Sequence, residues 1–468
     1  MGSELLIRSY NVGCGDCFYV CIPDEGDGFH MLIDCGSKES ARSGVMERSI
    51  RHLADEVLPA TGDGKKRLDL IVVTHRHEDH IKGFDPRFFH DIAIGHIWLP
   101  AAMNKDHPQA AQSVALHGLA ETEMRRLAES GAALSPELQD LVGLYGIRNA
   151  GAVEALTETL PEKNGIETRY VHAGMRSDAL GITIPDTVIH VLGPEEDVDF
   201  FYLGKELDDR LRGFQAGPAG ATGRTAPQAA EELPTNITGA DFRTLQSRLL
   251  SNALAFAVDD SSIQNNVSTV LLIEWKGKRL LFVGDAEWDE GFKPGRKNSA
   301  WNVMWEKRRD LLGAPIDFLK VGHHGSHNAT PWNRHADDDH EVNQIFDAIL
   351  PRPAEGHSPT ARCLVSTKRK QYDTIPDAEL LAELGKRSTG TKRYLSELKA
   401  ADAAFDPHDG VFNYSVMKTY SKPPSPRQVG DHGFLDEPQP RRTDLESAAR
   451  GASDLSGPAE FVDVLLEA

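Results

Sequence analysis

Hydrophobic and polar positions alternate along the first part of the chain in patterns that predict both strands and a helix. Short apolar runs bounded by turn residues are typical of strands, and they occupy residues 4–10, 17–22, 30–34 and 68–73. Between the third and fourth runs, residues 39–57 carry apolar side chains near the spacing of a helix. The pattern predicts a βββαβ order.

Further short apolar runs follow later in the chain. They lie at residues 188–194, 267–283 and 316–321, each bounded by turn residues. The longest run breaks at Gly277, within Lys-Gly-Lys, which predicts a hairpin. Strands mixed with helices in this way are typical of an α/β protein with two sheets covered by helices.

Two stretches interrupt this pattern, and a third follows it. Residues 103–165 are polar and helix-rich, while residues 196–264 include the Gly/Ala/Pro-rich sequence AGPAGATGRTAPQAA; both are predicted insertions. We expect one folded domain over residues 1–420 and a Pro-rich, charged tail over residues 421–468. The apolar end of that tail, EFVDVLLEA, is either a docking helix or a segment that packs on its own domain. The insertions and the tail are the candidate surfaces for a protein partner.

The chain carries a formal charge of -20 over 468 residues. This balance disfavours a general nucleic-acid-binding surface, because phosphate binding needs a positive field. Two basic runs, Lys368–Lys370 and Lys307–Arg309, are local candidates for phosphate contacts, with a solvated helix face as the alternative. The N-terminus lacks the pattern of a secretory signal, and no apolar run approaches the ~18 residues of a membrane span. We therefore expect a soluble, cytoplasmic protein with no membrane partner.

Five cysteines, an odd number spread unevenly, disfavour a secreted disulfide framework and predict reduced thiols. Cys14-x-x-Cys17 has the spacing that opens a zinc knuckle, but a second matched pair is missing from the sequence. Cys17, Tyr19 and Cys21 alternate like one face of a buried strand, where cysteine acts as a small hydrophobic residue. Packing is the favoured interpretation.

The sequence VVTHRHEDHIKGF collects candidate metal ligands in one turn after an apolar run. These are His75, His77, Asp79 and His80. Imidazole and carboxylate groups together suit zinc or manganese, and four of them can serve two adjacent ions. A solvated His-rich loop is the alternative, and the apolar run before the turn disfavours it.

Two later turns offer the ligands that one turn cannot supply. Asp285 follows the apolar run that ends in RLLFVG, and His323 and His324 follow the run at residues 316–321. Each signal alone is weak, since an Asp at the end of a strand is more often a cap. Three clusters of metal-binding residues at strand ends reinforce one another. We expect them to converge around two divalent metal ions, Zn²⁺ or Mn²⁺.

These segments resemble the metallo-β-lactamase-fold hydrolases, whose His-x-His-x-Asp-His signature matches His75, His77, Asp79 and His80. More narrowly, the chain resembles the hydrolase domain of ComEC-type competence proteins. The matching blocks, in order, are NVGCGDCFYV, MLIDCGS, VVTHRHEDHIKGF, VIHVLGP, NNVSTVLLIEWKGKRLLFVGDAEW, LKVGHHGS and CLVSTKRKQYDTIP. The resemblance implies an α/β, four-layer αββα metallo-β-lactamase fold with helical and loop insertions.

The resemblance also implies roles for the candidate ligands. The first metal would be bound by His75 and His77, and the second by Asp79, His80 and one histidine of GHHGS, with Asp285 bridging the two. His323 is favoured as that histidine because it comes first after the strand, while His324 is kept as a ligand or a substrate contact. Asp16 and Asp34 match positions that support the site from outside, with turn caps as the alternative.

Two departures from the family pattern bear on the site. Many members of the fold have a further metal-binding histidine before the bridging Asp, and no segment here fixes one. His172 lies in a turn that aligns better with relatives lacking this ligand, so the first metal would be weakly held. In DTIP, where relatives often have His before Pro, Thr374 and Ile375 cannot protonate a leaving group.

The chemistry implied is hydrolysis, in which two cations turn a water into hydroxide and stabilise the oxygens of a phosphoryl substrate. Asp79 would orient that water while binding metal. The candidates for transition-state contacts are Lys368, Ser326, Asn328 and Asn266, with turn capping and solvation as the alternatives.

The leading hypothesis is a metal-dependent phosphodiesterase or nuclease that acts on DNA or another nucleic acid. A second is hydrolysis of a small phosphoester, phosphorylcholine-like or nucleotide-derived, or of a lactone, with the insertions covering a small pocket. A third is a non-catalytic, metal-stabilised interaction module that binds a protein partner.

Overall fold

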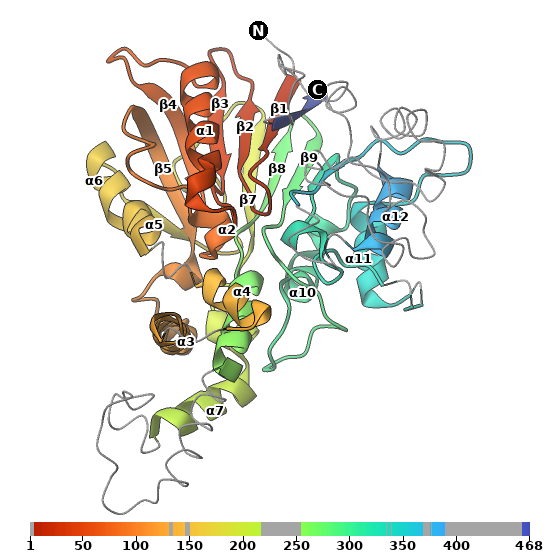
Figure 1. Ribbon diagram of the computed structural model, residues 1–468. Coiled ribbons are helices and arrows are strands. Elements are labelled where there is room, and N and C mark those ends of the chain that lie inside the picture. The colour runs from red at the N-terminus through yellow and green to blue at the C-terminus, as the bar shows by residue number, and fades with distance from the viewer. Residues whose placement is uncertain are drawn as a thin grey trace, which may run out of the picture.

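Two sheets packed against each other organise the protein (Figure 1). The computed structural model describes residues 4–130, 134–145, 150–216, 254–333, 335–337, 339–367, 375, 377–388 and 461–468. Within these residues, the first sheet has the strand order β12-β1-β2-β3-β4-β5-β6 and the second has the order β11-β10-β9-β8-β7.

The first sheet begins antiparallel and becomes parallel. Its strands are β1 (Glu4–Tyr10), β2 (Phe18–Ile22), β3 (Phe29–Ile33), β4 (Lys66–Val72), β5 (Ile92–Pro100), β6 (Thr168–Val171) and β12 (Phe461–Glu467). β12, β1, β2 and β3 pair antiparallel, and β3 to β6 pair parallel.

The second sheet has the same mixed character. Its strands are β7 (Thr187–Gly193), β8 (Val270–Trp275), β9 (Lys278–Phe282), β10 (Phe318–Lys320) and β11 (Arg362–Leu364). β7, β8 and β9 pair antiparallel, whereas β9, β10 and β11 pair parallel. The turns that leave β9 and β10 therefore start from the same edge of the sheet.

Helices flank both sheets. They are α1 (Val45–His52), α2 (Glu78–Ile81), α3 (Ala111–Glu129), α4 (Pro136–Leu144), α5 (Ala150–Glu154), α6 (Leu160–Asn164), α7 (Lys205–Ala216), α10 (Ala300–Leu312), α11 (Glu341–Ile349) and α12 (Ala378–Arg387). Residues 254–266 are also helical. Shorter helical turns lie at Ala41–Ser43, Leu53–Val57, Ala101–Met103, Ala155–Thr159, Asp199–Leu203 and His323–Gly325. No helix within the described ranges is long and apolar enough to span a bilayer.

Alternation along the strands builds three apolar layers, because successive side chains point to opposite faces of a sheet. Ile33 of β3 and Leu271 of β8 belong to the cluster between the two sheets. Leu32 belongs to a second cluster together with Ile50 of α1. Leu272 belongs to a third, with side chains of α10 and α11. The layers therefore run helix, sheet, sheet, helix.

The predicted order of elements is confirmed in the N-terminal part, where three strands, α1 with its following turn, and β4 succeed one another. The predicted hairpin is also confirmed as β8 and β9. Its turn residues, Lys276 and Gly277, have φ values of 47° and 81°. Positive φ at both central positions is the requirement of the tight turn that joins twisted strands.

The last described segment is a strand. β12 pairs with β1, and the guanidinium of Arg8 donates from Nε and Nη2 to the two carboxylate oxygens of Asp463, each at 2.7 Å. Of the two interpretations of EFVDVLLEA, the structure shows a segment that packs on its own domain. In the predicted insertions, residues 103–165 contain α3 to α6. Residues 217–253, with most of the Gly/Ala/Pro-rich sequence, and residues 421–460 lie outside the described ranges.

Candidate metal centre

The His-rich turn follows β4 and leads directly into α2. His75, His77, Asp79 and His80 are all at most 4% exposed. The chain is extended at His77, with φ of -62° and ψ of 150°, and becomes helical at Glu78, so Asp79 and His80 stand on the first turn of α2. The apolar strand before the turn and the buried residue that ends α2 hold these polar side chains inside the protein.

The two later turns meet this one. Asp285 lies just beyond β9, and its Oδ2 is 3.7 Å from His75 Nε2 and 3.2 Å from His80 Nε2. His324 lies just beyond β10, and its Nε2 is 3.0 Å from Asp79 Oδ2, a contact between residues 245 positions apart. The structure thus brings together all three clusters that the sequence placed at strand ends.

The side chains form overlapping groups with the composition of metal sites. His75, His77 and Asp285 form one group, and His80, Asp285 and His324 form another; in each, the candidate ligand atoms all lie within 4.8 Å of one another. His75 Nε2 and His77 Nδ1 are 2.9 Å apart. Because Asp285 belongs to both groups, its carboxylate has the position of a ligand shared between two ions.

The turn at residues 323–325 distinguishes its two histidines. His324 is 1% exposed and faces Asp79, whereas the His323 side chain is 25% exposed and its Nε2 is 3.9 Å from Asp285 Oδ2. Both residues have positive φ, 40° and 55°, which non-glycine residues adopt at a cost of about 1–3 kcal/mol. This left-handed turn directs the second histidine inward. The placement therefore favours His324 as the ligand, whereas the order along the sequence favoured His323.

Hydrogen bonds fix which ring nitrogen each histidine presents. His80 Nδ1 lies 2.8 Å from Asp34 Oδ2, and His324 Nδ1 lies 2.8 Å from the Ser366 carbonyl oxygen. An oxygen acceptor at Nδ1 places the proton there and leaves the Nε2 lone pair for a metal. Thr74 holds Asp34 in turn, since its backbone N–H and hydroxyl each donate to that carboxylate at 2.7 Å. Asp34 therefore supports the site from outside, in the position that the resemblance implied.

Asp16 also lies behind the site. It is 1% exposed and forms an ion pair with the buried ammonium of Lys320, whose Nζ also donates to the Gly284 carbonyl at 3.0 Å. The backbone N–H of Asp16 donates to the Asp79 carbonyl at 2.9 Å. Gly36 completes this contact, because a Cβ at that position would overlap the peptide that follows Asp79. No local pattern in the sequence predicted the contribution of Lys320.

Electrostatics keep several of these groups in the protonation states that bind metals. Burial lowers the pKa of His77 to about 4 and holds the pKa of His75 well below its usual value. Burial raises the pKa of Asp285, but His80 and His323 outweigh it and hold that pKa well below its usual value. Neutral imidazole and ionised carboxylate are the forms that coordinate a cation.

The pKa of His80 is shifted in the opposite direction from the pKa values of His75 and His77. Burial lowers its pKa, but the carboxylates of Asp285 and Asp34 outweigh burial and hold that pKa well above its usual value. In the metal-free protein these carboxylates therefore favour the protonated form of the ring. A cation at Nε2 competes with a proton for the same lone pair, so metal binding at this residue is coupled to proton release.

The site also contains polar atoms that protein groups leave unsatisfied. Within the described residues, Asp79 Oδ1, His80 Nε2 and His323 Nδ1 are buried and make no hydrogen bond. Buried polar groups in folded proteins are nearly always paired, because an unpaired one costs about 1–3 kcal/mol. Cations held between Asp79, His80 and Asp285 would satisfy the first two atoms, so the residues fit a divalent metal.

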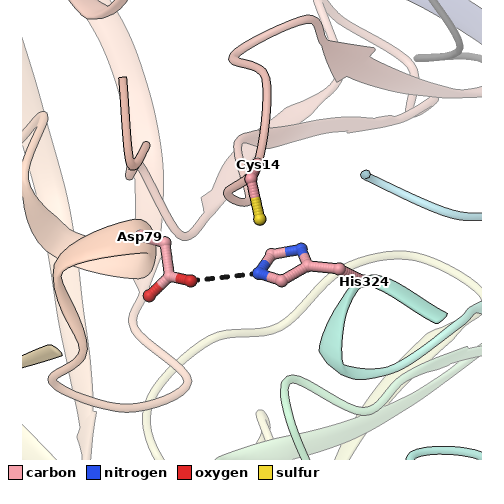
Figure 2. Close-up of side chains that lie close together, drawn as sticks. All are labelled: Cys14, Asp79 and His324. Atoms are coloured by element: carbon pink, nitrogen blue, oxygen red, sulfur yellow. Dashed lines mark hydrogen bonds and ion pairs between the residues drawn. The ribbon is translucent and has the colours of Figure 1, made fainter. Parts of the chain in front are cut away.

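Cys14 lies at the site, although packing was the interpretation that the sequence favoured over a zinc knuckle. Figure 2 shows its sulfur beside Asp79 and His324, and the three candidate ligand atoms lie within 4.8 Å of one another. Cys17, in contrast, belongs to the apolar cluster between the first sheet and α1, as predicted. The Cys-x-x-Cys spacing therefore does not form one knuckle. The sequence feature that could have placed Cys14 at the site is the order of the motifs: NVGCGD comes before MLIDCGS and VVTHRHEDHIKGF.

Three further candidates from the sequence have contacts within the protein. Asn266 accepts hydrogen bonds from the backbone N–H groups of Glu287 and Ala300 at 3.2 and 2.7 Å, which is a structural role. The Ser326 hydroxyl donates to Asn328 Oδ1 at 2.6 Å. These bonds favour the turn-capping alternative over a substrate contact for Asn266 in particular.

The remaining candidates belong to no candidate metal group among the described residues or lie outside the described ranges. His172 belongs to no candidate metal group among the described residues. The basic run Lys368–Lys370 and Thr374 lie outside the residues that the structure describes. Their predicted roles therefore stay predictions.

The second basic run lies on α10. Lys307 Nζ is 5.5 Å from the centroid of the Phe201 ring, and the Arg309 guanidinium is 4.6 Å from that of Trp305. Arg308 forms an ion pair with Glu195. These contacts within the protein favour a structural role for this run over a phosphate contact.

Comparison with protein families identifies the segment that contains the His-rich turn. Residues 12–124 match the family model described as the metallo-beta-lactamase superfamily. This segment therefore resembles a metallo-beta-lactamase superfamily domain. The matched segment includes Cys14, Asp34 and the whole His-rich turn, and the two packed sheets with outer helices are the layers expected of this fold. The predicted α/β metallo-β-lactamase fold is therefore confirmed. No curated protein matches the chain.

Solved structures show only distant likeness to this chain. A mutant of CmlA beta-hydroxylase is 13% identical with a TM-score of 0.30; the match covers 78% of this chain and 46% of the CmlA chain. YhfI from Bacillus subtilis, a metallo-beta-lactamase fold protein, is 9% identical with a TM-score of 0.25, covering 68% of this chain and 70% of YhfI. Zn(2+)-bound PqqB from Methylobacterium extorquens is 10% identical with a TM-score of 0.35, covering 82% of this chain and 96% of PqqB.

Proposed function

We propose that this chain is a metal-dependent hydrolase that cleaves phosphodiesters, with nucleic acid as its substrate class. The observation that carries the proposal is the position of Asp285, whose carboxylate belongs both to the group with His75 and His77 and to the group with His80 and His324. Two ligand sets that share a carboxylate suit a pair of ions acting on one ester.

Two divalent cations bound in these groups would supply a hydroxide near neutral pH and positive charge for a phosphoryl oxygen. The protein residues orient the metal ligands and the attacking water. Asp34 and the Ser366 carbonyl orient His80 and His324, so that their Nε2 atoms face the site. Asp79 presents its carboxylate beside His324 and is proposed to orient the attacking water.

The preference for nucleic acid is supported by the ComEC-type resemblance and by the basic run Lys368–Lys370. Two described cations beside the site already have carboxylate partners: Lys38 Nζ is 3.3 Å from Asp79 Oδ2, and Lys320 pairs with Asp16. A phosphate contact therefore needs a further cation, and Lys368 is our candidate. The net charge of -20 limits binding to a local contact rather than a long duplex track.

A substrate panel with matched histidine variants tests the proposal. The protein is loaded with Zn²⁺ or Mn²⁺ and incubated with a bis-aryl phosphodiester, single-stranded DNA, a small phosphomonoester and a lactone. We expect the first two to be hydrolysed, His77→Ala to remove the activity, and His90→Ala to leave it unchanged. His90 is an exposed histidine that belongs to no candidate metal group among the described residues.

Each other outcome has a definite meaning. Equal rates for the unchanged protein and His77→Ala would overturn the proposal. Hydrolysis of only the monoester or the lactone would support the small-molecule alternative. Stoichiometric metal without hydrolysis of any substrate would support an interaction module stabilised by metal.

A further inference from the structure

Cys14 is the cysteine whose surroundings differ from those of the other four. It lies in the loop between β1 and β2 and is 1% exposed. Cys17 and Cys35 belong to the apolar cluster beneath α1, Cys21 packs against that cluster, and Cys363 belongs to the cluster beneath α10 and α11. Cys14 belongs to none of the apolar clusters formed by the described residues. Its burial is therefore not explained by apolar packing.

The groups that face the Cys14 sulfur are polar. In Figure 2 the sulfur points toward the His324 ring, and Asp79 faces that ring with Oδ2 and turns its other oxygen away; the candidate ligand atoms of the three residues lie within 4.8 Å of one another. Asp79 is 1% exposed, and its Oδ1 makes no hydrogen bond within the described part of the protein. Protein groups therefore leave this carboxylate incompletely satisfied. A cation at this place would be met by sulfur, carboxylate and imidazole together.

The backbone holds Cys14 in this position from both sides. Its carbonyl accepts a hydrogen bond from the Lys38 N–H at 2.8 Å, and two residues later the Asp16 N–H donates to the Asp79 carbonyl at 2.9 Å. Gly15 allows this close approach, because it has φ of 150° and a Cβ there would lie 2.9 Å from the Asp79 carbonyl oxygen. The loop is thus fixed to the metal-binding helix before any ion arrives, which reduces the entropic cost of recruiting a ligand.

We propose that Cys14 is a ligand of the second metal ion, which it binds together with Asp79 and His324. The inference rests on the proposed metal centre and adds a residue that neither the family signature nor the resemblance assigns. On binding, the sulfur–hydrogen bond breaks, the proton passes to solvent and the sulfur bonds to the metal. Thiolate favours zinc, whereas carboxylate and water suit manganese. Cys14 therefore makes the second site selective for zinc.

Cobalt substitution tests the ligand directly. Co²⁺ takes the place of zinc, and a bond from thiolate to Co²⁺ gives an intense charge-transfer band in the near ultraviolet that nitrogen and oxygen ligands do not give. We expect the band in the unchanged protein and in Cys21→Ser, and its loss in Cys14→Ser. No other cysteine belongs to a candidate metal group among the described residues, so the band has one source.

Metal affinity supplies a second readout that does not depend on the band. Competition with a chelator should show that Cys14→Ser weakens zinc binding by more than about tenfold, since even supporting residues contribute about 10–100-fold. Manganese binding should change by less than about threefold, because thiolate adds little to it. The metal-free proteins are compared by circular dichroism and thermal unfolding, so that a general folding defect is recognised.

The outcomes separate the two proposals. Two bound Co²⁺ ions without a thiolate band, or an equal band in Cys14→Ser, would overturn the role of Cys14 and leave the metal centre intact. Failure of the protein to bind any divalent ion would overturn both. The spectrum of the unchanged protein decides the question even if Cys14→Ser does not fold.

Discussion

Two buried aspartates in this protein differ in whether both of their carboxylate oxygens have hydrogen-bond partners. Around Asp260, which is fully buried, Gln264 Nε2 lies 3.0 Å from one oxygen, and the Tyr145 hydroxyl and His117 Nδ1 lie 2.8 and 2.9 Å from the other. At the metal centre, Asp79 Oδ1 and His80 Nε2 make no hydrogen bond within the described residues. The same residue types thus form a hydrogen-bonded structural network around Asp260 and a set of candidate metal ligands at the metal centre. The difference is that the protein supplies hydrogen-bond partners for both oxygens of Asp260 but not for Oδ1 of Asp79.

The largest expected effect comes from removing the shared carboxylate. Asp285→Ala should abolish binding of both ions and lower hydrolysis more than about a thousandfold, because the charge that metals supply to a transition state contributes several kcal/mol. Metal counting and turnover measurements check this. Bound metal and activity that both survive would show that the centre is not organised around Asp285.

A change at Asp260 should affect stability instead of metal. Asp260→Ala is expected to lower the free energy of unfolding by about 3–5 kcal/mol, because it leaves buried partners unpaired. Denaturant titration measures the loss, while metal content should stay unchanged. Asp208→Ala is the control: Asp208 pairs with Arg212 at the surface, so its removal should leave stability nearly unchanged. Loss of metal in Asp260→Ala would contradict the separation of the two clusters.

The stability that Asp260 contributes should also depend on pH. Burial raises the pKa of Asp260, but the neighbouring His117, Gln264 and Tyr145 outweigh it and hold that pKa below its usual value. A carboxyl with a lowered pKa in the folded state contributes stability above its unfolded pKa and loses it as the pH falls through the folded value. The unfolding free energies of the unchanged protein and Asp260→Ala should therefore converge in acid. A constant difference would contradict this assignment.

Zinc itself should stabilise the fold through the unsatisfied cluster. At a free concentration 100 times its Kd, the ion is expected to raise the free energy of unfolding by about 2.7 kcal/mol. Thermal unfolding with zinc and with a chelator measures the difference. Asp285→Ala should show no such rise, and an equal rise in that variant would indicate binding elsewhere.

The smallest expected effect concerns the residue behind His80. Asp34→Asn should weaken metal binding about 10–100-fold without removing it, because it alters the partner that orients a ligand. Asparagine is the suitable replacement, since Asp34 has φ of 57° and Asn tolerates that conformation. Chelator competition measures the change, and an unaltered affinity would assign Asp34 to the turn alone.

Local patterns in the sequence predicted the elements of the fold and the three turns of the site. β4 and β8 could be recognised because runs of apolar residues ended in turn signals, and the ligand types marked which turns mattered. Convergence of His75, Asp285 and the histidines after β10 followed from their shared position at strand ends. These inferences needed only short windows of sequence.

The details that the sequence left open depend on contacts between distant segments. His324 rather than His323 faces Asp79 because the backbone there is left-handed, a conformation that histidine rarely adopts and that residue type does not reveal. Cys14 reaches the site because its loop is hydrogen-bonded to α2, and no local pattern marks that pairing. The contact of Asp16 with Lys320 depends in the same way on how the two sheets pack.

β1 can pair with β12 only after nearly all of the residues between them have been synthesised. Arg8 and Asp463 are 455 positions apart, so at the usual pace of translation the first strand waits roughly 20 to 90 seconds for its neighbour. During that interval the edge of β1 lacks its partner strand, and an unpaired edge can pair with strands of other molecules. A charged residue on such an edge discourages unwanted pairing. Arg8 places such a charge on the strand whose edge β12 covers in the folded protein.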